Sequence, residues 1–431
     1  MSDTERVFLI GVVWGNESLA HFNESMNELR QLADTAGCEV VDMFSQAAKR
    51  PNIATYVGKG KLQEIKNAAS SSHIHTLIFN NNLSPSQSRN ISDITGCNVV
   101  DRTEIILDIF ANHARTKQSK LQVELAQLEY AYTKLKRKWK HLSRIQGGIG
   151  FRGPGETQIE VDRREIRKKT TILKKRIKNI EQVSLTKRNK RKNLKSIALV
   201  GYTNAGKSTL FNKLTCENRY TADQLFATLD SKTRAITADF EEKIVITDTI
   251  GFIRKLPHRL VSSFNSTLLE VLEADLLLHV VDVSHQNLFE FMEAVEGVLQ
   301  EIKVDHKNIL MIFNKSDKMS GSHFLFMKKQ LINKYPDSVF ISAKTGEGID
   351  HLLIKIEEFI QRSKKDIELE VPAEMQNLIS FLHKNAEIIE NKYNKSTNSQ
   401  LLKLKISGQL LEGIKKQIED YNLLKFINNN K

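Results

Sequence analysis

Cysteine and long apolar runs are what this sequence of 431 residues has least of. Its three cysteines, Cys38, Cys97 and Cys216, are too widely spaced to indicate a disulfide framework or a zinc site. The apolar runs are too short to cross a bilayer, and the N-terminus has no signal-peptide pattern. No internal repeat of fixed period is present. These absences favour a soluble, cytoplasmic protein with no membrane span, and we expect a monomer.

Acidic residues are scarce in one segment. Between Lys134 and Lys195 there are 22 lysines and arginines against five acidic residues, a net charge of +17, whereas the whole chain carries +13. The rest of the chain therefore sums to −4. Ordinary solvated helices alternate charges of both signs, so this excess predicts a polyanionic partner such as RNA.

The first part of the chain, residues 1–110, alternates apolar runs with amphipathic segments. That alternation is typical of a small α/β domain with a mostly parallel sheet. We expect strands at 6–12, 39–44, 75–79 and 98–100, and helices at 17–36, 60–69 and 84–94.

The second part, residues 111–195, is predicted to be a basic helical hairpin with a linker. Helical periodicity covers about 101–145 and resumes at 157–183, on either side of the glycine-rich segment Gly147–Gly155. We expect the hairpin to bind RNA phosphates through its cations and the glycine-rich segment to enter an RNA crevice. Trp139 either stacks on a base or packs between the helices.

Two further parts follow. Residues 196–363 again alternate strand and helix, with strands expected at 235–237, 244–247, 276–281, 309–313 and 339–341. Residues 364–431 predict a small α+β domain, with strands at 367–371, 388–393 and 401–406 and helices at 373–384 and 409–421. The expected fold class is α/β: a phosphate-loop domain, preceded by a small α/β domain with a helical hairpin and followed by a small α+β domain.

The third part opens with an apolar run and then GYTNAGKS, which fits the phosphate-loop pattern G-x-x-x-x-G-K-[ST] between a strand and a helix. The glycines let backbone N–H groups turn toward phosphate oxygens, and the helix start adds the positive end of its dipole. Lys207 supplies a positive charge, and the Ser208 hydroxyl a magnesium ligand. The predicted nucleotide-binding residues are Gly201, Tyr202, Thr203, Asn204, Ala205, Gly206, Lys207 and Ser208.

Two downstream segments predict the parts that respond to the terminal phosphate. Asp248 can hold magnesium through water, and the N–H of Gly251 can meet the terminal phosphate. Thr228 can complete the magnesium shell when that phosphate is present; Thr221 and Thr233 are alternatives, although Thr233 is expected to begin the next strand. The predicted nucleotide-binding residues here are Phe226, Ala227, Thr228, Leu229, Asp230, Asp248, Thr249, Ile250 and Gly251.

The base is expected to bind at two later strand ends. Asp317, in the run Asn314, Lys315, Ser316 and Asp317, can accept two N–H bonds from guanine, and adenine has no matching donors. The N–H of Ala343, in the run Ser342, Ala343 and Lys344, can serve the guanine O6. We assign catalysis to Lys207, Thr228 and Gly251, and magnesium ligation to Ser208 and Thr228.

Three residues or runs leave alternatives open. Phe252 stands where many nucleotide hydrolases of this kind place a water-orienting glutamine, which predicts slow hydrolysis without a partner; the alternative is that it only packs. In some GTPases that this loop resembles, an asparagine at the position of Asn204 helps to hold a potassium ion beside the phosphates; the alternative is that Asn204 has no such role. The run GKGK at 58–61 contacts RNA phosphate, forms a second nucleotide site, or is a plain turn.

The order of these motifs resembles a translation-factor-type GTPase, and FATLD at 226–230 with DTIGF at 248–252 is similar to the Obg–HflX group. Three upstream runs resemble the HflX family specifically: YVGKGKLQEI at 56–65, DRTEIILDIFANHARTKQSKLQVELAQLEY at 101–130, and GGIGFRGPGETQIEVDRREI at 147–166. The resemblance covers roughly residues 5–365.

The resemblance implies a magnesium-dependent GTPase that binds the large (50S) ribosomal subunit, hydrolyses GTP and splits stalled or idle ribosomes. Two other functions stay open: a nucleotide-dependent RNA remodeller that also uses ATP, and a GTP switch in ribosome assembly with negligible turnover.

Overall fold

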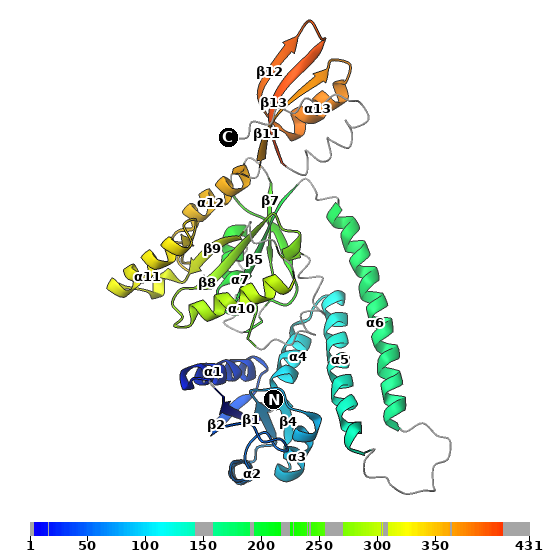
Figure 1. Ribbon diagram of the computed structural model, residues 1–431, viewed down its shortest axis with the longest axis vertical. Helices are drawn as coiled ribbons and strands as arrows, with labels where there is room; N and C mark the ends of the chain where they lie inside the picture. Colours follow the sequence, from blue (N-terminus) through cyan, green and yellow to red (C-terminus); the bar gives the residue numbers. More distant parts are fainter. Residues whose placement is uncertain are drawn as a thin grey trace. The chain divides into compact units, whose positions relative to one another are not determined.

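The structure is a computed structural model. It describes residues 4–15, 17–142, 158–189, 194–216, 225–226, 228–238, 240, 243–254, 270–302, 304, 309–362 and 364–407. These residues form two compact units, Met1–Glu347 and Gly348–Lys431, each of which is described by itself (Figure 1). None of the described helices is long and apolar enough to span a membrane.

The first unit begins with a four-stranded parallel sheet in the order β2-β1-β3-β4. Alternate residues of β1 point to opposite faces: Val7 and Leu9 pack with α1 and α4, whereas Phe8 and Ile10 pack with α2 and α3. The expected mostly parallel sheet is confirmed. The elements are β1 (Arg6–Trp14), α1 (Leu19–Thr35), β2 (Glu39–Ala48), α2 (Lys59–Ser72), β3 (Thr76–Phe79), α3 (Pro85–Thr95), β4 (Asn98–Asp101) and α4 (Arg102–His113).

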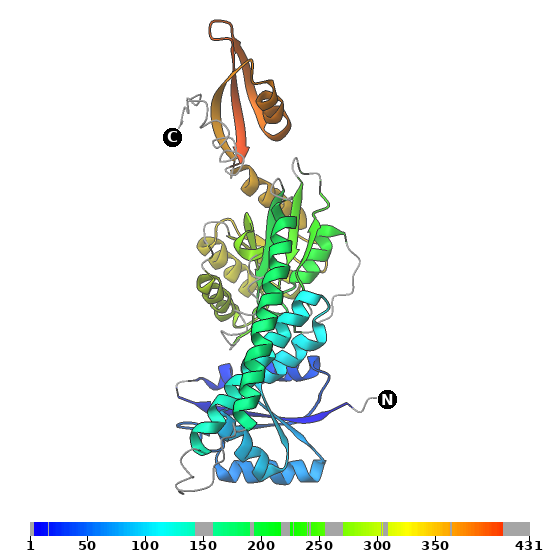
Figure 2. The ribbon, with the colours of Figure 1, turned by 90° about the vertical axis from the view of Figure 1, so that its right-hand side faces the viewer.

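Two long helices follow, α5 (Lys117–Leu142) and α6 (Gln158–Asn189). They pack along each other through an apolar seam that includes Leu125, Leu173 and Ile177. Glu129 of α5 contacts Lys174 of α6, and Tyr132, further along α5, contacts Arg167, which is earlier in α6. The two helices are therefore antiparallel. Figure 2 shows α6 lying alongside α5. The helical hairpin expected here is present; Gly147–Gly155 and the side chain of Trp139 lie outside the described residues.

The phosphate-loop part of the first unit is a six-stranded sheet in the order β10-β9-β8-β5-β7-β6. Its strands are parallel except β6, which pairs antiparallel with β7. β6 occupies 232–235 rather than the expected 235–237, because its pairing with β7, not an apolar run, sets its bounds. The elements are β5 (Lys195–Gly201), α7 (Lys207–Thr215), β6 (Lys232–Ala235), β7 (Ile244–Asp248), β8 (Leu276–Asp282), α10 (Leu288–Glu301), β9 (Ile309–Asn314), the 3-10 turn η2 (Ser316–Lys318), α11 (Gly321–Lys334) and β10 (Val339–Phe340).

The second unit combines helix α12 (Ile349–Arg362) with a three-stranded antiparallel sheet in the order β11-β13-β12. Its core includes Leu369, Leu382, Leu402 and Leu404. The elements are β11 (Lys364–Pro372), α13 (Gln376–Asn385), β12 (Glu387–Asn394) and β13 (Ser399–Ser407). These are the predicted α+β elements, except that the helix expected at 409–421 lies outside the described residues. The four-part division into 1–110, 111–195, 196–363 and 364–431 stays a prediction.

Candidate functional site

The phosphate loop joins the end of β5 to the start of α7, and its glycines are required by close packing. A Cβ on Gly201 would lie 2.3 Å from the carbonyl oxygen of Val280. Gly206 has a φ of +92°, and a Cβ there would lie 2.2 Å from Asn314 Nδ2. Larger residues at either position would therefore displace the loop from the sheet beneath it.

Lys207 is the first residue of α7, and its side chain is only 6% exposed. Its Nζ donates to the carbonyl oxygens of Gly201 (3.1 Å) and Tyr202 (2.8 Å). Burial lowers the pKa of Lys207 to about 8, and the carboxylate of Asp248 opposes this shift. A buried cation is thus held within the loop, where an incoming phosphate is a strong partner.

Three oxygen donors meet beside this cation. Ser208 Oγ lies 2.9 Å from Thr228 Oγ1, which donates to Asp248 Oδ2 at 3.0 Å. Asp248 is 1% exposed, and its Oδ1 has no hydrogen-bond partner within the described part of the chain. Two hydroxyl oxygens as ligands, beside a buried carboxylate whose free oxygen can hold the ion through water, fit a magnesium ion. When bound, the ion would neutralise charge on the phosphates.

The segment after β7 lies directly against the phosphate loop. Phe252 N donates to the Gly201 carbonyl oxygen at 3.1 Å, and Thr203 N donates to the Phe252 carbonyl oxygen at 2.7 Å. A Cβ on Gly251 would lie 2.8 Å from Thr203 Cγ2 and 3.0 Å from Lys207 Nζ, so only glycine fits there. The Phe252 ring is 4% exposed and belongs to the main core cluster. The packing role considered for Phe252 is therefore present.

The base-recognition motif is tied to the phosphate loop through Asn314. Its Nδ2 donates to the Ala205 carbonyl oxygen at 2.8 Å, and its Oδ1 accepts the Ala343 N–H at 2.9 Å. The Ala343 N–H that we expect to bind guanine O6 thus donates to Asn314 in this structure. Its role at the base stays a prediction. Asp317, on η2, is exposed, as is Lys344. Lys315 pairs with Asp282 at 2.7 Å.

The remaining predicted residues have varied surroundings. Thr249 Oγ1 donates to the Leu199 carbonyl oxygen inside the sheet, so its hydroxyl is taken up structurally. Thr203 Oγ1 is buried without a partner in the described residues, whereas Asn204 is exposed. Thr228 lies beside Ser208, whereas Thr233 lies in β6, as expected. Thr221 and Ala227 lie outside the described residues.

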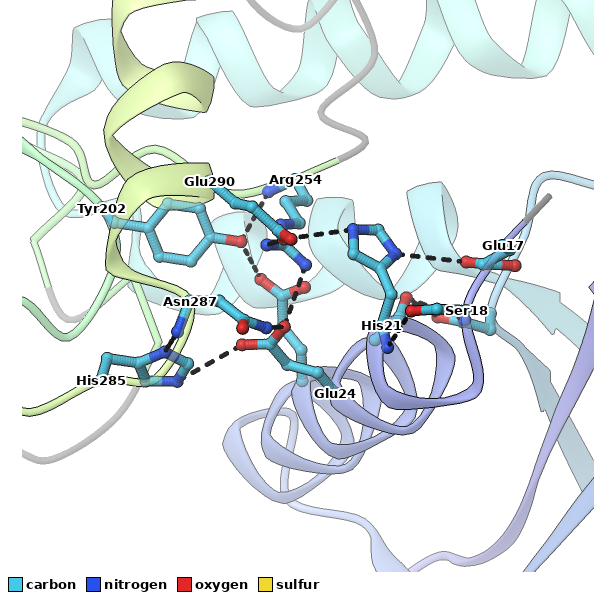
Figure 3. Close-up of polar contacts among 12 residues, drawn as sticks. Glu17, Ser18, His21, Glu24, Tyr202, Arg254, His285, Asn287 and Glu290 are labelled. Carbon is cyan, nitrogen blue, oxygen red and sulfur yellow. Dashed lines mark hydrogen bonds and ion pairs between the residues drawn. The ribbon is translucent and has the colours of Figure 1, made fainter.

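Sequence reasoning missed a contact between the phosphate loop and helix α1. The hydroxyl of Tyr202 donates to Glu28 Oε1 at 2.5 Å. It also accepts the backbone N–H of Arg254 at 2.9 Å (Figure 3). The Tyr202 ring stacks on Phe291 of α10, with centroids 4.0 Å apart. Burial is the main cause that raises the pKa of Tyr202, so the phenol stays protonated and donates. Glu28 also pairs with the buried Arg102 at 2.6 Å.

A second set of contacts extends this interface. The guanidinium of Arg254 pairs with Glu24 of α1 and Glu290 of α10, and Glu24 also accepts a hydrogen bond from Asn287 (Figure 3). The sequence signal for this interface is the spacing of Glu24 and Glu28, four residues apart, because it places both carboxylates on one face of a helix.

Comparisons with known proteins agree with this architecture. Four family models match consecutive stretches: "GTP-binding GTPase N-terminal" at residues 23–111, "GTP-binding GTPase Middle Region" at 113–191, "50S ribosome-binding GTPase" at 196–315, and "HflX C-terminal domain" at 327–422.

Curated relatives match along most of their length. The GTPase HflX of Flavobacterium psychrophilum is 42% identical over 83% of this chain and 91% of its own, and that of Escherichia coli is 40% identical over 89% and 90%. A solved GTP-binding protein of Sulfolobus solfataricus in complex with GDP is 28% identical over 83% and 99%, with a TM-score of 0.45. This chain therefore belongs to the HflX family of GTPases, whose substrate is GTP.

Proposed function

We propose that this GTPase binds the large (50S) ribosomal subunit and splits stalled or idle ribosomes. The observation that carries the proposal is the helical arm, which we define as α5 and α6. On α6, Lys168, Lys169 and Lys175 are exposed, while the apolar side chains Leu173 and Ile177 face α5. A rigid pair of helices with an outward cationic face suits the phosphate backbone of ribosomal RNA.

The catalytic part of the proposal rests on the oxygen donors beside the phosphate loop. Ser208 and Thr228 ligate magnesium, Asp248 holds it through water, and Lys207 with the loop N–H groups binds the phosphates. Gly251 meets the terminal phosphate, and Asp317 accepts the guanine N–H groups. We also propose that Asn204 helps to hold a potassium ion, and a comparison of turnover in sodium and potassium buffers tests this.

The GTP-bound state is proposed to order the segments around Thr228 and Gly251 and thereby favour the ribosome-bound form of the arm. The protein then works as a monomer in the cytoplasm, where its ribosomal partner is found. The glycine-rich segment Gly147–Gly155 is proposed to reach functional RNA of the large subunit.

Sedimentation of intact ribosomes in sucrose gradients tests this function. The full-length protein is added with GTP, with a non-hydrolysable GTP analogue or with GDP, and a Ser208→Ala variant serves as the control that lacks a magnesium ligand. We expect separated subunits with GTP and with the analogue, and intact ribosomes with GDP or with the variant. Binding to subunits without separation would favour the assembly switch, and intact ribosomes in every lane would contradict the proposal.

A further inference from the structure

Asp230 lies two residues after Thr228, yet its carboxylate faces the arm rather than the phosphate loop. Its Oδ2 accepts the backbone N–H groups of Arg115 (3.0 Å) and Thr116 (3.2 Å), and its Oδ1 accepts the Thr116 hydroxyl at 2.7 Å. These donors stand immediately before α5, which begins at Lys117. All three hydrogen bonds join segments more than 110 residues apart in the sequence.

Thr116 is the residue that caps α5. Its hydroxyl oxygen accepts the N–H of Ser119 at 3.1 Å, and its carbonyl oxygen accepts the N–H of Lys120 at 3.1 Å. The Asp230 carboxylate therefore binds the N-cap residue of the first arm helix. A negative charge is favourable there, because the first N–H groups of a helix are unpaired and the helix dipole is positive at this end.

Apolar side chains on both sides of Thr228 also anchor the segment. Phe226 is 2% exposed, and its ring packs edge-on against Phe110 of α4, with centroids 4.7 Å apart. Leu229 is buried in the same core cluster as Phe110. Thr228 thus projects toward Ser208 and Asp248 from a short segment whose two ends are fixed to α4 and to the start of α5.

We propose that Asp230 is a positioning residue that fixes Thr228 for the magnesium–triphosphate complex and couples that complex to the start of the helical arm. The inference rests on the proposed metal-binding role of Thr228. Two residues of chain span at most about 7 Å, so Thr228 cannot move far without straining the bonds of Asp230 to Thr116. Because coupling between two sites is reciprocal, triphosphate binding also steadies the N-terminus of α5.

The full-length protein with an Asp230→Ala substitution tests this coupling through nucleotide affinities measured in the presence of magnesium. Thr228 contributes only when the terminal phosphate is present, so a non-hydrolysable GTP analogue should bind about tenfold more weakly, the effect of losing one helix-capping interaction. Affinity for GDP should change little. A merely structural role would weaken both nucleotides alike, and that result, or no change in either, would overturn the inference.

A double-mutant cycle with Thr116→Val identifies the contact itself. If the two residues act through one interaction, the double variant should lose little more analogue affinity than either single variant. Additive losses would show that the residues act separately and would contradict the coupling. Thr116→Val also carries the test from the arm side if Asp230→Ala does not fold.

Two further variants separate the possible causes. Ser84→Ala removes the cap of α3, a comparable loss at a helix whose Ile91 belongs to a different core cluster from Phe226 and Leu229, and should leave the ratio of analogue to GDP affinity unchanged. Thr228→Ala should lose analogue affinity itself. Unchanged affinity in Thr228→Ala would contradict the proposed metal role, whereas a loss there with none in Asp230→Ala would overturn only the present inference.

Hydrogen exchange reports the arm directly, without any ribosome. In the wild-type protein the analogue, compared with GDP, should slow amide exchange in the first turn of α5. In Asp230→Ala this difference should disappear. Exchange in α5 that is the same with both nucleotides in the wild-type protein would show that the coupling does not exist.

Discussion

Buried polar atoms gather around the phosphate loop. Thr203 Oγ1 and Asp248 Oδ1 are buried without a hydrogen-bond partner among the described residues, and Lys207 is a buried cation. Leaving the two oxygens without a hydrogen bond costs roughly 1–3 kcal/mol each, so a fold retains them where a ligand satisfies them. At the scale of single residues, these buried polar groups lower the stability of the fold and form a site suited to phosphates and a metal ion.

Asp317 is expected to determine the choice of base. Asp317→Asn removes the charged acceptor for two guanine N–H groups, so guanine nucleotide affinity should fall by about 10- to 100-fold while adenine nucleotide affinity stays unchanged. Calorimetric titration with GDP and ADP measures both affinities, and Asp350→Asn, an exposed aspartate in the first turn of α12, is the matched control. Equal affinity for the two nucleotides in the wild-type protein would favour the ATP-using remodeller.

His279, in the centre of β8, should make stability depend on pH. Burial, together with the nearby charge of Lys207, lowers the pKa of His279 to about 3, so the unfolded chain takes up a proton near pH 6.5 while the folded protein does not. Stability is therefore lost as the pH falls from about 6.5 toward 3, by up to about 1.4 kcal/mol per pH unit.

Urea unfolding at pH 7 and pH 5 measures this loss, with the relevant transition identified as the one that guanine nucleotide shifts. The wild-type protein should lose more stability between these values than His279→Leu, whose leucine matches the apolar neighbours in the strand. His351→Leu, at an exposed histidine, is the control. The same pH dependence in the wild-type protein and His279→Leu would contradict the expectation.

At the scale of elements, the arm combines an apolar seam with an outer face rich in lysine and arginine. α5 and α6 bury one apolar seam between them and direct lysines and arginines of α6 outward. An isolated helix of this charge would repel itself, and the seam holds the cations in place. The arm therefore buries apolar side chains between its own two helices and presents cations on its outer face.

Single glutamine substitutions at Lys168, Lys169 and Lys175 are expected to weaken binding to the large subunit. Each lost phosphate contact should reduce the slope of log affinity against log salt by roughly 0.7–0.9. Co-sedimentation across a salt series measures the slope, and Lys329→Gln on α11 is the control. GTP hydrolysis by the protein alone should not change. A loss as large in Lys329→Gln would mean that overall charge, rather than the arm, governs binding.

At the scale of the whole molecule, one apolar core joins the first sheet to the phosphate-loop sheet within the first unit. Phe110 of α4, Phe226 and Phe252 all belong to it, so the segments that are predicted to face the terminal phosphate pack against α4, the helix that precedes the arm. Because close-packed interiors resist gradual deformation, a displacement at the phosphate loop is transmitted to the elements packed against it.

Hydrolysis by the protein alone is expected to be slow. Phe252 is buried and cannot orient the attacking water, so we expect large subunits to accelerate phosphate release by on the order of 10³-fold or more, the range known for partner-supplied groups. Multiple-turnover assays with and without purified large subunits measure the ratio, with Ser208→Ala as the inactive control. Turnover that is equally fast without subunits would contradict a partner-dependent mechanism.

The sequence by itself determined the elements and the order of the nucleotide motifs. GYTNAGKS predicts a phosphate loop because its glycines, lysine and serine are neighbours in the chain, and the structure places it between β5 and α7. The preference for Thr228 over Thr233 also followed from local pattern, since Thr233 lies in β6. These features depend on short-range geometry, which a run of residues carries within itself.

Only the tertiary structure decided which distant segments meet those motifs. Tyr202 binds Glu28 across 174 residues, and Asp230 binds Thr116 across 114. From the sequence, Asp230 belonged with the nucleotide-binding residues, whereas its carboxylate is bound at the start of α5. Such pairings follow from how two sheets and their helices share one core, and the hydrogen-bonding capacity of a side chain does not specify which of many distant partners it will find.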